Sequence, residues 1–322
     1  MVVLVLANLT NLIADFAGIA SSLELFHMSR YVTVPLGAIV VWALVVKGSY
    51  RSVEKIFLFA CIVYIAYFVS GVLVRPNWKL AMMDSVRPVL MFDGGYITMV
   101  IAMVGTSIAP WMQFYQQSAI VEKGVTAKEI GESRLEVILS CIMTSVVAFF
   151  IVVACAGAIY SVQPRDIENA AEAALGLRPF GAYATLLFAV GLFNASLFAA
   201  CILPLSTSYS VCEGLGFESG VNKRFREAPI FYWLFTLLIV VGAGVILWPR
   251  FPLVKMILFS QVINGVLLPF VLIFMALLIN KKGLMKEWTN TRFYNVIVWG
   301  SVALMIGLTL ALAAISIQDF RR

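Results

Sequence analysis

Charged residues are scarce in this chain of 322 residues. They make up 12% of it, about half the usual share. Hydrophobic residues make up 62%, against about 45–50% in ordinary globular domains. A soluble domain of this size could not keep so much apolar surface away from water. The composition therefore excludes an ordinary soluble protein and indicates that lipid surrounds most of the chain.

Residues that bind structural metals or perform catalysis are also few. His27 is the only histidine, which excludes a histidine-rich metal site, and the five cysteines do not have metal-ligand spacing. There is no Ser/His/Asp set, phosphate-binding glycine loop or convergent pair of carboxylates. We therefore expect a protein that is not an enzyme and has no cofactor. A membrane protein without catalytic groups is most often a transporter or channel.

Long runs without charge dominate the rest of the sequence. Most of them exceed the ~20 residues that a helix needs to cross the hydrocarbon core. The sequence predicts an all-α polytopic membrane protein, with residues 1–322 forming a single transmembrane domain of about nine helices. The predicted spans are residues 1–26, 31–46, 56–74, 94–121, 137–164, 179–212, 228–249, 256–280 and 293–318.

The net charge of +6 reflects basic loops and does not indicate a nucleic-acid partner. If residue 1 is cytoplasmic, the cytoplasmic loops hold 13 of the 23 Lys and Arg residues, which agrees with the positive-inside rule. The acidic loop 163–178, with Asp166, Glu168 and Glu172, then lies outside. These cytoplasmic loops are residues 47–55, 122–134, 212–228 and 281–292.

The fourth predicted span, residues 94–121, contains the most specific motif. Asp93 precedes it and is placed to cap a helix. Pro110 cannot donate a backbone hydrogen bond and disfavours helix at Ala109, and Gly105, Thr106 and Ser107 stand just before it. This pattern predicts a broken helix whose free carbonyls line an ion site. A simple proline kink is the alternative, and the polar residues that favour an ion pathway are Gln113, Gln116 and Gln117.

Three other predicted spans carry polar groups at membrane depth. Asn8, Asn11 and Asp15 recur at helical spacing, so they share one face. Asp15 is either a cation-pathway residue or part of a buried salt bridge. The remaining two groups are ion ligands or interhelical hydrogen-bonding residues: Gln261 and Asn264 before Pro269, and Asn194 and Ser196 before Pro204 and residues 206–208.

These ordered motifs resemble the natural-resistance-associated macrophage protein (NRAMP) family of divalent-metal transporters. The resemblance implies a LeuT-type inverted-repeat fold of eleven helices. Residues 105–118 resemble the family's broken sixth helix, and residues 14–17 resemble its third-helix T-D-x-A-E motif. Residues 260–262, followed by 268–270, resemble its tenth helix.

The sequence departs from the family at the metal site. Ala109-Pro110-Trp111 stands where metal-scavenging members have Met-Pro-His. A thioether favours transition metals, whereas oxygen ligands and retained water suit Mg²⁺. The departures therefore predict a site for Mg²⁺, with Mn²⁺ a possible second substrate. The expected metal-site residues are Thr106, Ala109, Trp111, Gln113 and Gln261.

Groups of the family's proton route are also replaced. Gln116 aligns with a family histidine and Gly18 with a glutamate, so Asp15 is the one titratable residue left on that route. The pattern resembles the NRAMP-related magnesium transporter branch, which carries Mg²⁺ without proton coupling. Lys123 aligns with a family arginine, and Arg224 lies near the start of the family's ninth helix. Both are therefore expected charge partners of Asp15.

By this alignment the nine spans correspond to family helices three to eleven, without helices one and two. We therefore expect weak or absent transport by this chain alone, in a monomer surrounded by the bilayer. Two alternatives stay open. One is a proton-coupled Mn²⁺ or Fe²⁺ carrier, or another carrier on the same scaffold such as an amino-acid permease. The other is a non-transporting assembly subunit.

Overall fold

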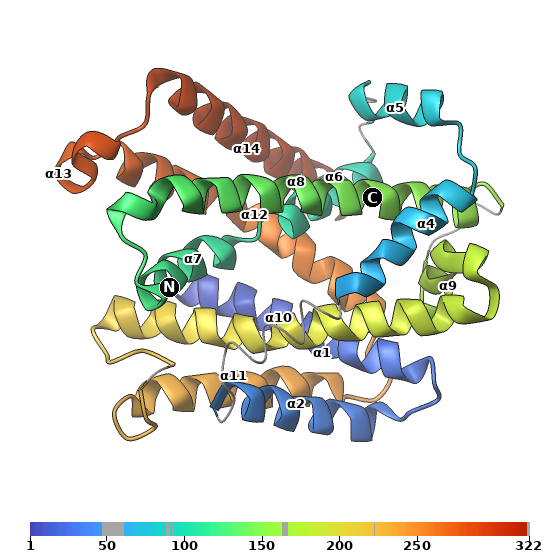
Figure 1. Ribbon diagram of the computed structural model, residues 1–322, viewed down its shortest axis with the longest axis horizontal. Helices are drawn as coiled ribbons and strands as arrows, with labels where there is room; N and C mark the ends of the chain where they lie inside the picture. The colour runs from blue at the N-terminus through green and yellow to red at the C-terminus, as the bar shows by residue number, and fades with distance from the viewer. Residues whose placement is uncertain (47–60, 88–90, 92, 163–166, 222, 321–322) are drawn as a thin grey trace. The chain divides into compact units, whose positions relative to one another are not determined.

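The fold was analysed in a computed structural model that describes residues 1–46, 61–87, 91, 93–162, 167–221 and 223–320. Helices make up nearly all of this described part (Figure 1). The membrane helices and their connecting elements are α1 Val2–Glu24, α2 Arg30–Val46, η1 Cys61–Tyr64, α4 Ile65–Leu73, α5 Trp78–Val86, α6 Gly94–Ser107, α7 Pro110–Lys123, η2 Ala127–Glu129, α8 Ile130–Cys155, the π-helical η3 Ala156–Tyr160, α9 Ala170–Ala174, η4 Leu175–Tyr183, α10 Ala184–Leu215, α11 Pro229–Ile246, α12 Leu253–Ile279, α13 Lys282–Met285, η5 Lys286–Trp288 and α14 Arg292–Phe320.

Seven helical stretches in the described ranges are long and apolar enough to cross a membrane. The pair formed by η1–α4 and α5 is bent by 112° and would make an eighth span. The one predicted span that remains is 31–46. It forms α2, which is apolar but has 17 residues, slightly short of a full span. The chain is thus an all-α multi-pass membrane protein, as the charge-free runs predict.

Several of the sequence expectations fall wholly or partly outside the described residues. The loop 47–55 and the start of the span 56–74 belong to the undescribed stretch 47–60, and Asp166 of the acidic loop belongs to 163–166. The short helix α5 was not expected, since its residues lie between the predicted spans 56–74 and 94–121. Its start is marked by Asn77, whose side chain accepts a hydrogen bond from the Leu80 N–H at 3.1 Å.

The described residues divide into two compact units. The first comprises Met1, Asn8–Pro88 and Tyr115–Ile257, and the second comprises Val2–Ala7, Val89–Phe114 and Leu258–Arg322. Three of the boundaries between these units fall inside helices, since α1, α7 and α12 each contribute to both units.

The core of the first unit forms where α1, α2, α10 and α11 pack, and Figure 1 shows these four helices as neighbouring rods. Phe16 of α1 and Phe231 of α11 are fully buried. Gly242 allows α11 to approach α1, since a Cβ there would lie 2.9 Å from Leu12 Cγ. The Trp42 indole N–H donates to Thr236 Oγ1 at 3.0 Å and joins α2 to α11. Aromatic burial and small residues therefore hold these helices together.

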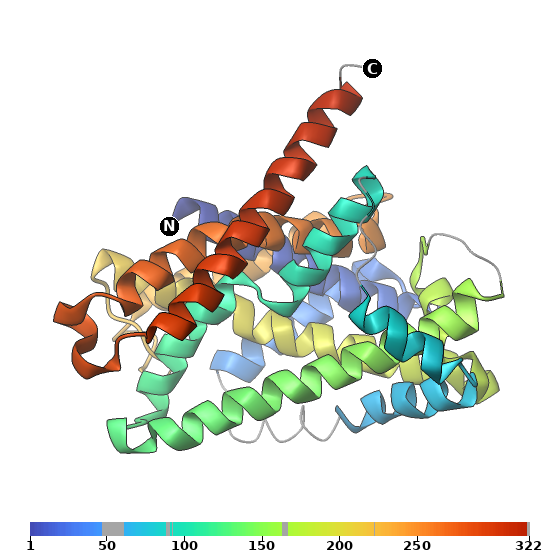
Figure 2. The same ribbon diagram turned by 90° about the horizontal axis from the view of Figure 1, so that it is seen from above.

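The second unit contains α6, most of α12, and α14, which contacts α6. Asp93 caps α6, as expected, because its carboxylate accepts hydrogen bonds from the N–H groups of Gly95 at 3.0 Å and Tyr96 at 3.3 Å. Figures 1 and 2 both show α13 at the tip of the connection between α12 and α14. This unit carries most of the residues that the sequence assigns to the ion site.

Candidate functional site

The helix that begins at Gly94 is interrupted at Ile108 and Ala109. α6 ends at Ser107, Ile108 takes a non-helical conformation (φ −134°, ψ 83°), and α7 begins at Pro110. Proline fits the first position of a helix, where no intrahelical N–H bond is made, and it disfavours helix in the residue before it. The Thr106 carbonyl therefore has no N–H four residues ahead to accept from. Ala109 is 2% exposed and Ile108 is 42% exposed, so only the Ala109 side of the interruption is buried.

Gly105, one turn before the interruption, touches the backbone of α12. A Cβ on Gly105 would collide with the Gln261 carbonyl oxygen and would lie 2.5 Å from the Gly265 nitrogen. The contact is reciprocal, since a Cβ on Gly265 would collide with the Ile101 carbonyl oxygen. Small residues at a helix crossing permit this kind of close backbone approach. The crossing therefore places the interrupted helix directly against the turn of α12 that carries Gln261.

Three polar side chains of α12 are linked to one another at this crossing. Asn264 Nδ2 donates to Gln261 Oε1 at 3.3 Å, and Gln261 Nε2 donates to Ser260 Oγ at 3.0 Å. Ser260 and Asn264 are buried, whereas Gln261 is half-buried. The bonds orient the Gln261 amide and leave one lone pair of its oxygen for another donor or a cation. The structure thus brings the helix interruption and the predicted α12 ligands together.

The other expected residues of this segment differ in exposure. Thr106 is exposed, Trp111 and Gln113 are half-buried, and Gln116 and Gln117 are exposed on α7. Ser118, which follows them, is buried, and its hydroxyl donates to Glu213 Oε1 of α10 at 3.2 Å. Sequence reasoning missed the partnership with Glu213, because nothing in the motif indicates which helix α7 meets.

Asp15 lies on the face of α1 that packs against α10, within the first unit. A Cβ at Gly18, one turn away, would collide with Ser196 Oγ of α10. Asp15 Oδ2 is enclosed and accepts no hydrogen bond from the described residues. A carboxyl oxygen enclosed without a donor is costly to keep, which marks Asp15 as a candidate for a functional role.

The polar face shared by Asn8, Asn11 and Asp15 is present on α1. Asn8 and Asn11 are 2% and 4% exposed. Asn8 Nδ2 donates to Thr207 Oγ1 at 2.9 Å, while Asn8 Oδ1 is buried without a partner in the described part of the chain. Thr207 thus serves as an interhelical hydrogen-bonding residue, one of the two interpretations open for the polar stretch of α10.

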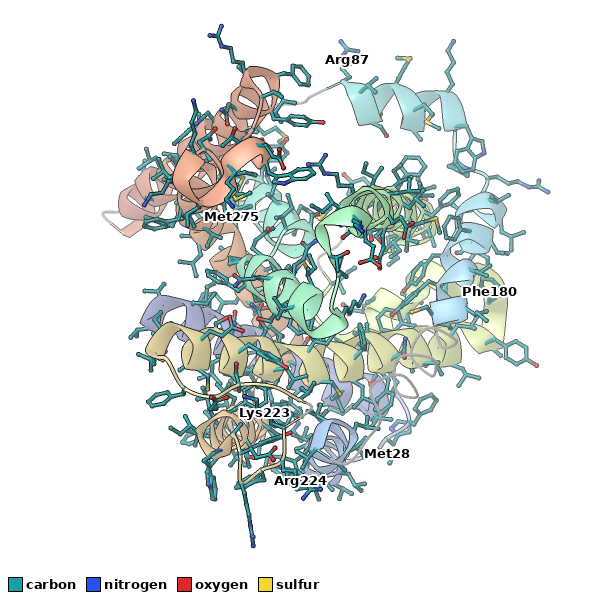
Figure 3. All side chains as sticks on the ribbon, turned by 60° about the vertical axis from the view of Figure 1, so that its left-hand side comes forward. Met28, Arg87, Phe180, Lys223, Arg224 and Met275 are labelled. Carbon is teal, nitrogen blue, oxygen red and sulfur yellow. The ribbon has the colours of Figure 1, made fainter. Side chains whose placement is uncertain are left out.

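The two expected charge partners lie away from the Asp15 carboxylate. Lys123 Nζ is 3.9 Å from Glu136 Oε1, and both side chains are largely exposed. Arg224 lies in the connection between α10 and α11, where Figure 3 shows it with Lys223, and its side chain is exposed. Within the described ranges, no lysine or arginine lies within 4.0 Å of Asp15. The structure therefore does not bring these residues together as a salt bridge.

Two further features complete the description of the site. Among the described residues, no three or more His, Cys, Asp or Glu side chains are grouped to hold a metal. An open pocket of about 220 Å³ has a mostly apolar lining and does not include the predicted ligands. Its lining residues are Gly94, Gly95, Thr98, Met99, Ala102, Leu258 and Val262.

These features define a multi-pass α-helical protein of the cell membrane, with one membrane helix interrupted beside a group of amide side chains. The chain belongs to the natural resistance-associated macrophage protein-like family, whose model matches residues 1–314. The family expected from the sequence is therefore confirmed, whereas the magnesium branch and the correspondence to helices three to eleven stay predictions.

Two curated relatives are similar over most of the chain. The divalent metal cation transporter MntH of Ralstonia nicotianae is 26% identical over 320 residues, covering 91% of this chain and 69% of the relative. The divalent metal cation transporter MntH 1 of Pseudomonas aeruginosa is 24% identical over 331 residues, covering 95% of this chain and 72% of the relative.

Proposed function

We propose that this chain carries a divalent metal ion across the membrane, with Mg²⁺ as its preferred substrate and without coupled proton movement. Membership of the family and the names of both relatives support divalent metal transport. One observation carries the proposal: the interruption at Ile108 and Ala109 lies next to the α12 turn with the oriented Gln261 amide. Interrupted helices supply the ion sites of many secondary transporters.

The preference for Mg²⁺ follows from the ligand chemistry at the interruption. The Thr106 carbonyl and Gln261 Oε1 are hard oxygen ligands, and Ala109 offers no sulfur. Mg²⁺ prefers oxygen ligands and keeps several of its waters, while thioether sulfur favours softer metals. The half-buried Gln113 adds a further amide beyond the break. Together these groups suit a partly hydrated ion better than a tightly ligated transition metal.

One observation favours a proton-coupled carrier as the second candidate. Asp15 is a titratable group enclosed between α1 and α10, and its Oδ2 has no donor among the described residues. Carboxylates in such positions serve as proton relays in many transporters. In the favoured proposal Asp15 instead keeps its charge throughout the cycle and relays no proton.

Ion uptake into proteoliposomes tests both candidates. Purified full chain is reconstituted, and internal Mg²⁺ or Mn²⁺ and internal pH are recorded with trapped dyes under an inward metal gradient. We expect protein-dependent Mg²⁺ influx without acidification. Influx of Mn²⁺ alone, accompanied by acidification, would favour the coupled carrier. Absence of any metal influx, from liposomes in which the protein is folded and inserted, would reject transport by this chain.

The Ala109→Met substitution tests the site itself. A methionine at the interruption adds a soft ligand and removes space, so we expect the ratio of Mn²⁺ to Mg²⁺ uptake to rise by about tenfold, which corresponds to ~1.4 kcal/mol. The matched control is Ala119→Met, ten residues further along the chain in α7, which should leave the ratio unchanged. An equal ratio in both variants would remove Ala109 from the ion site.

A further inference from the structure

The connection between α12 and α14, residues 281–292, is a second feature with a chemical character of its own. It comprises the short helix α13 and the single turn η5, and we call it the basic hairpin. In Figures 1 and 2 it projects from the shared end of α12 and α14. The ion-transport proposal assigns it no role.

Amide side chains fix the base of the basic hairpin. Asn280, at the end of α12, and Asn295, in the first turn of α14, each donate an Nδ2 hydrogen bond to the other's Oδ1 at 2.8 Å. Asn290 Nδ2 also donates to Asn295 Oδ1 at 3.3 Å. Asn280 Nδ2 additionally donates to the Ala276 carbonyl at 2.7 Å. These bonds give the intervening residues a defined geometry rather than that of a free loop.

The cations of the basic hairpin are exposed, and the part of the chain that the structure describes offers them no acidic partner. Among the described residues, no carboxylate lies within 4.0 Å of Lys281, Lys282, Lys286 or Arg292. Glu287 is the only acidic residue of the hairpin, so four cations face one carboxylate. The connection between α10 and α11 differs, since Lys223 there is paired with Glu218. The basic hairpin therefore carries a local excess of positive charge available to an external anion.

Large apolar side chains are exposed among these cations. Leu284 and Trp288 are 61% and 44% exposed, and Phe293 is 71% exposed at the start of α14. The hairpin directly joins two candidate membrane spans, Leu253–Ile279 and Arg292–Ile315. Its residues therefore lie at the ends of two membrane spans, close to the level where the hydrocarbon ends. Tryptophan and other aromatic side chains are enriched at that level, where polar headgroups begin.

We propose that the basic hairpin binds anionic phospholipid headgroups, with its lysines on the phosphates and its apolar side chains in the boundary of the acyl region. Basic residues beside a membrane helix attract anionic lipid, and an amphipathic surface adds apolar burial. A nucleic acid or an acidic protein would match the cations but would leave Leu284 and Phe293 exposed to water. The combination of charge and apolar surface thus selects the lipid.

Binding of dansyl-labelled phosphatidylglycerol, measured by energy transfer from tryptophan in nonionic detergent, tests the proposal on the full chain. We expect phosphatidylglycerol to bind more tightly than phosphatidylcholine, and binding to weaken as KCl is raised, because salt screens exposed charges. The triple substitution Lys281→Gln, Lys282→Gln and Lys286→Gln should weaken binding by about tenfold or more, given the attraction of each lysine near an anionic surface.

The matched control removes three exposed cations elsewhere, by Arg75→Gln, Lys79→Gln and Arg87→Gln; Figure 3 shows Arg87 at the end of α5. Equal losses in both triple variants, or equal affinity of the native chain for both lipids, would overturn the proposal. Inorganic phosphate that competes as well as phosphatidylglycerol would also overturn it, as would a polyanionic RNA that displaces the lipid at equal charge concentration. The preference of the native protein for phosphatidylglycerol over phosphatidylcholine at low salt is measured without any variant. It therefore tests the proposal even if a variant fails to fold.

Discussion

Two pairs of helices in this protein are held together in different ways. Between α1 and α10 the contact involves polar side chains, with the Asn8–Thr207 hydrogen bond and the enclosed Asp15 carboxyl on the same face of α1. Between α6 and α12 it is made by backbone, because Gly105 and Gly265 bring the two main chains together. The α1–α10 contact buries polar groups, and it leaves Asn8 Oδ1 and Asp15 Oδ2 without a partner among the described residues. The α6–α12 contact gives close packing instead.

The difference implies different tolerance to substitution. A side-chain hydrogen bond in a membrane contributes about 0.6 kcal/mol on average, so its loss is small. A backbone contact has no flexible atoms that can move aside, so any added side chain must separate the helices. We therefore expect the α6–α12 crossing to determine whether the protein folds, and the α1–α10 face to determine how it works.

The largest expected effect is that of Gly105→Val. The added Cβ would collide with the Gln261 carbonyl oxygen, and overpacking of this kind costs about 1–3 kcal/mol or more. Separation of the helices would also move the α12 amides away from the interruption. We expect a lower melting temperature in detergent and loss of metal uptake from the same variant.

Gly300→Val is the matched control for that prediction. Gly300 lies on α14 in the same unit, and a Cβ there meets nothing within 4 Å. The control should melt within a few degrees of the native protein and keep its uptake. If Gly105→Val melts no lower than Gly300→Val, the backbone contact does not hold the crossing together.

The sequence was informative wherever one residue determines local structure. Charge-free runs predict the membrane helices, Pro110 indicates where the helix starting at Gly94 ends, and Asp93 indicates where it begins. Each of these effects is local, because it depends on solvation or on hydrogen bonds within a few residues.

The sequence was uninformative about which faces meet. Nothing near Gly265 indicates that its partner is Ile101, and nothing near Asn8 indicates Thr207, which is 199 residues away. In lipid most apolar faces are nearly equivalent, so small residues and hydrogen bonds select the pairing. The structure does not pair Asp15 with Lys123 or Arg224. A sequence alignment gives the position of a residue along its own helix, but it does not give the residue that faces it on a neighbouring helix.

The second prediction separates stability from activity at Asp15. Asp15→Asn keeps the size of the side chain and removes its charge, so the cost of burying an unpartnered carboxylate falls. We expect the free energy of unfolding to stay equal or rise by about 1 kcal/mol, since an unsatisfied buried group costs ~1–3 kcal/mol. Metal uptake should fall at least about tenfold if the charge of Asp15 is needed for transport, an effect of ~1.4 kcal/mol.

Glu24→Gln is the control on the same helix. Glu24 forms an ion pair with Arg30 at 2.8 Å near the end of α1, where water is accessible. Its neutralisation should lower stability slightly and leave uptake unchanged. Equal uptake in Asp15→Asn and native protein would show that the enclosed carboxyl is structural, and would remove it from both the coupled and the uncoupled mechanism.

The smallest expected effect is at the hydrogen bond between α1 and α10. A double-mutant cycle with Asn8→Ala and Thr207→Val should give a coupling energy of about 0.6 kcal/mol by equilibrium unfolding in detergent. Thr207 also donates to the Leu203 carbonyl at 2.9 Å within α10, so its single substitution should cost more than the coupling alone. The cycle for Trp42→Phe and Thr236→Val, across α2 and α11, provides the comparison. A coupling well above 2 kcal/mol at Asn8 would mean that this face, too, is essential for folding, and that the two contacts differ less than their geometry implies.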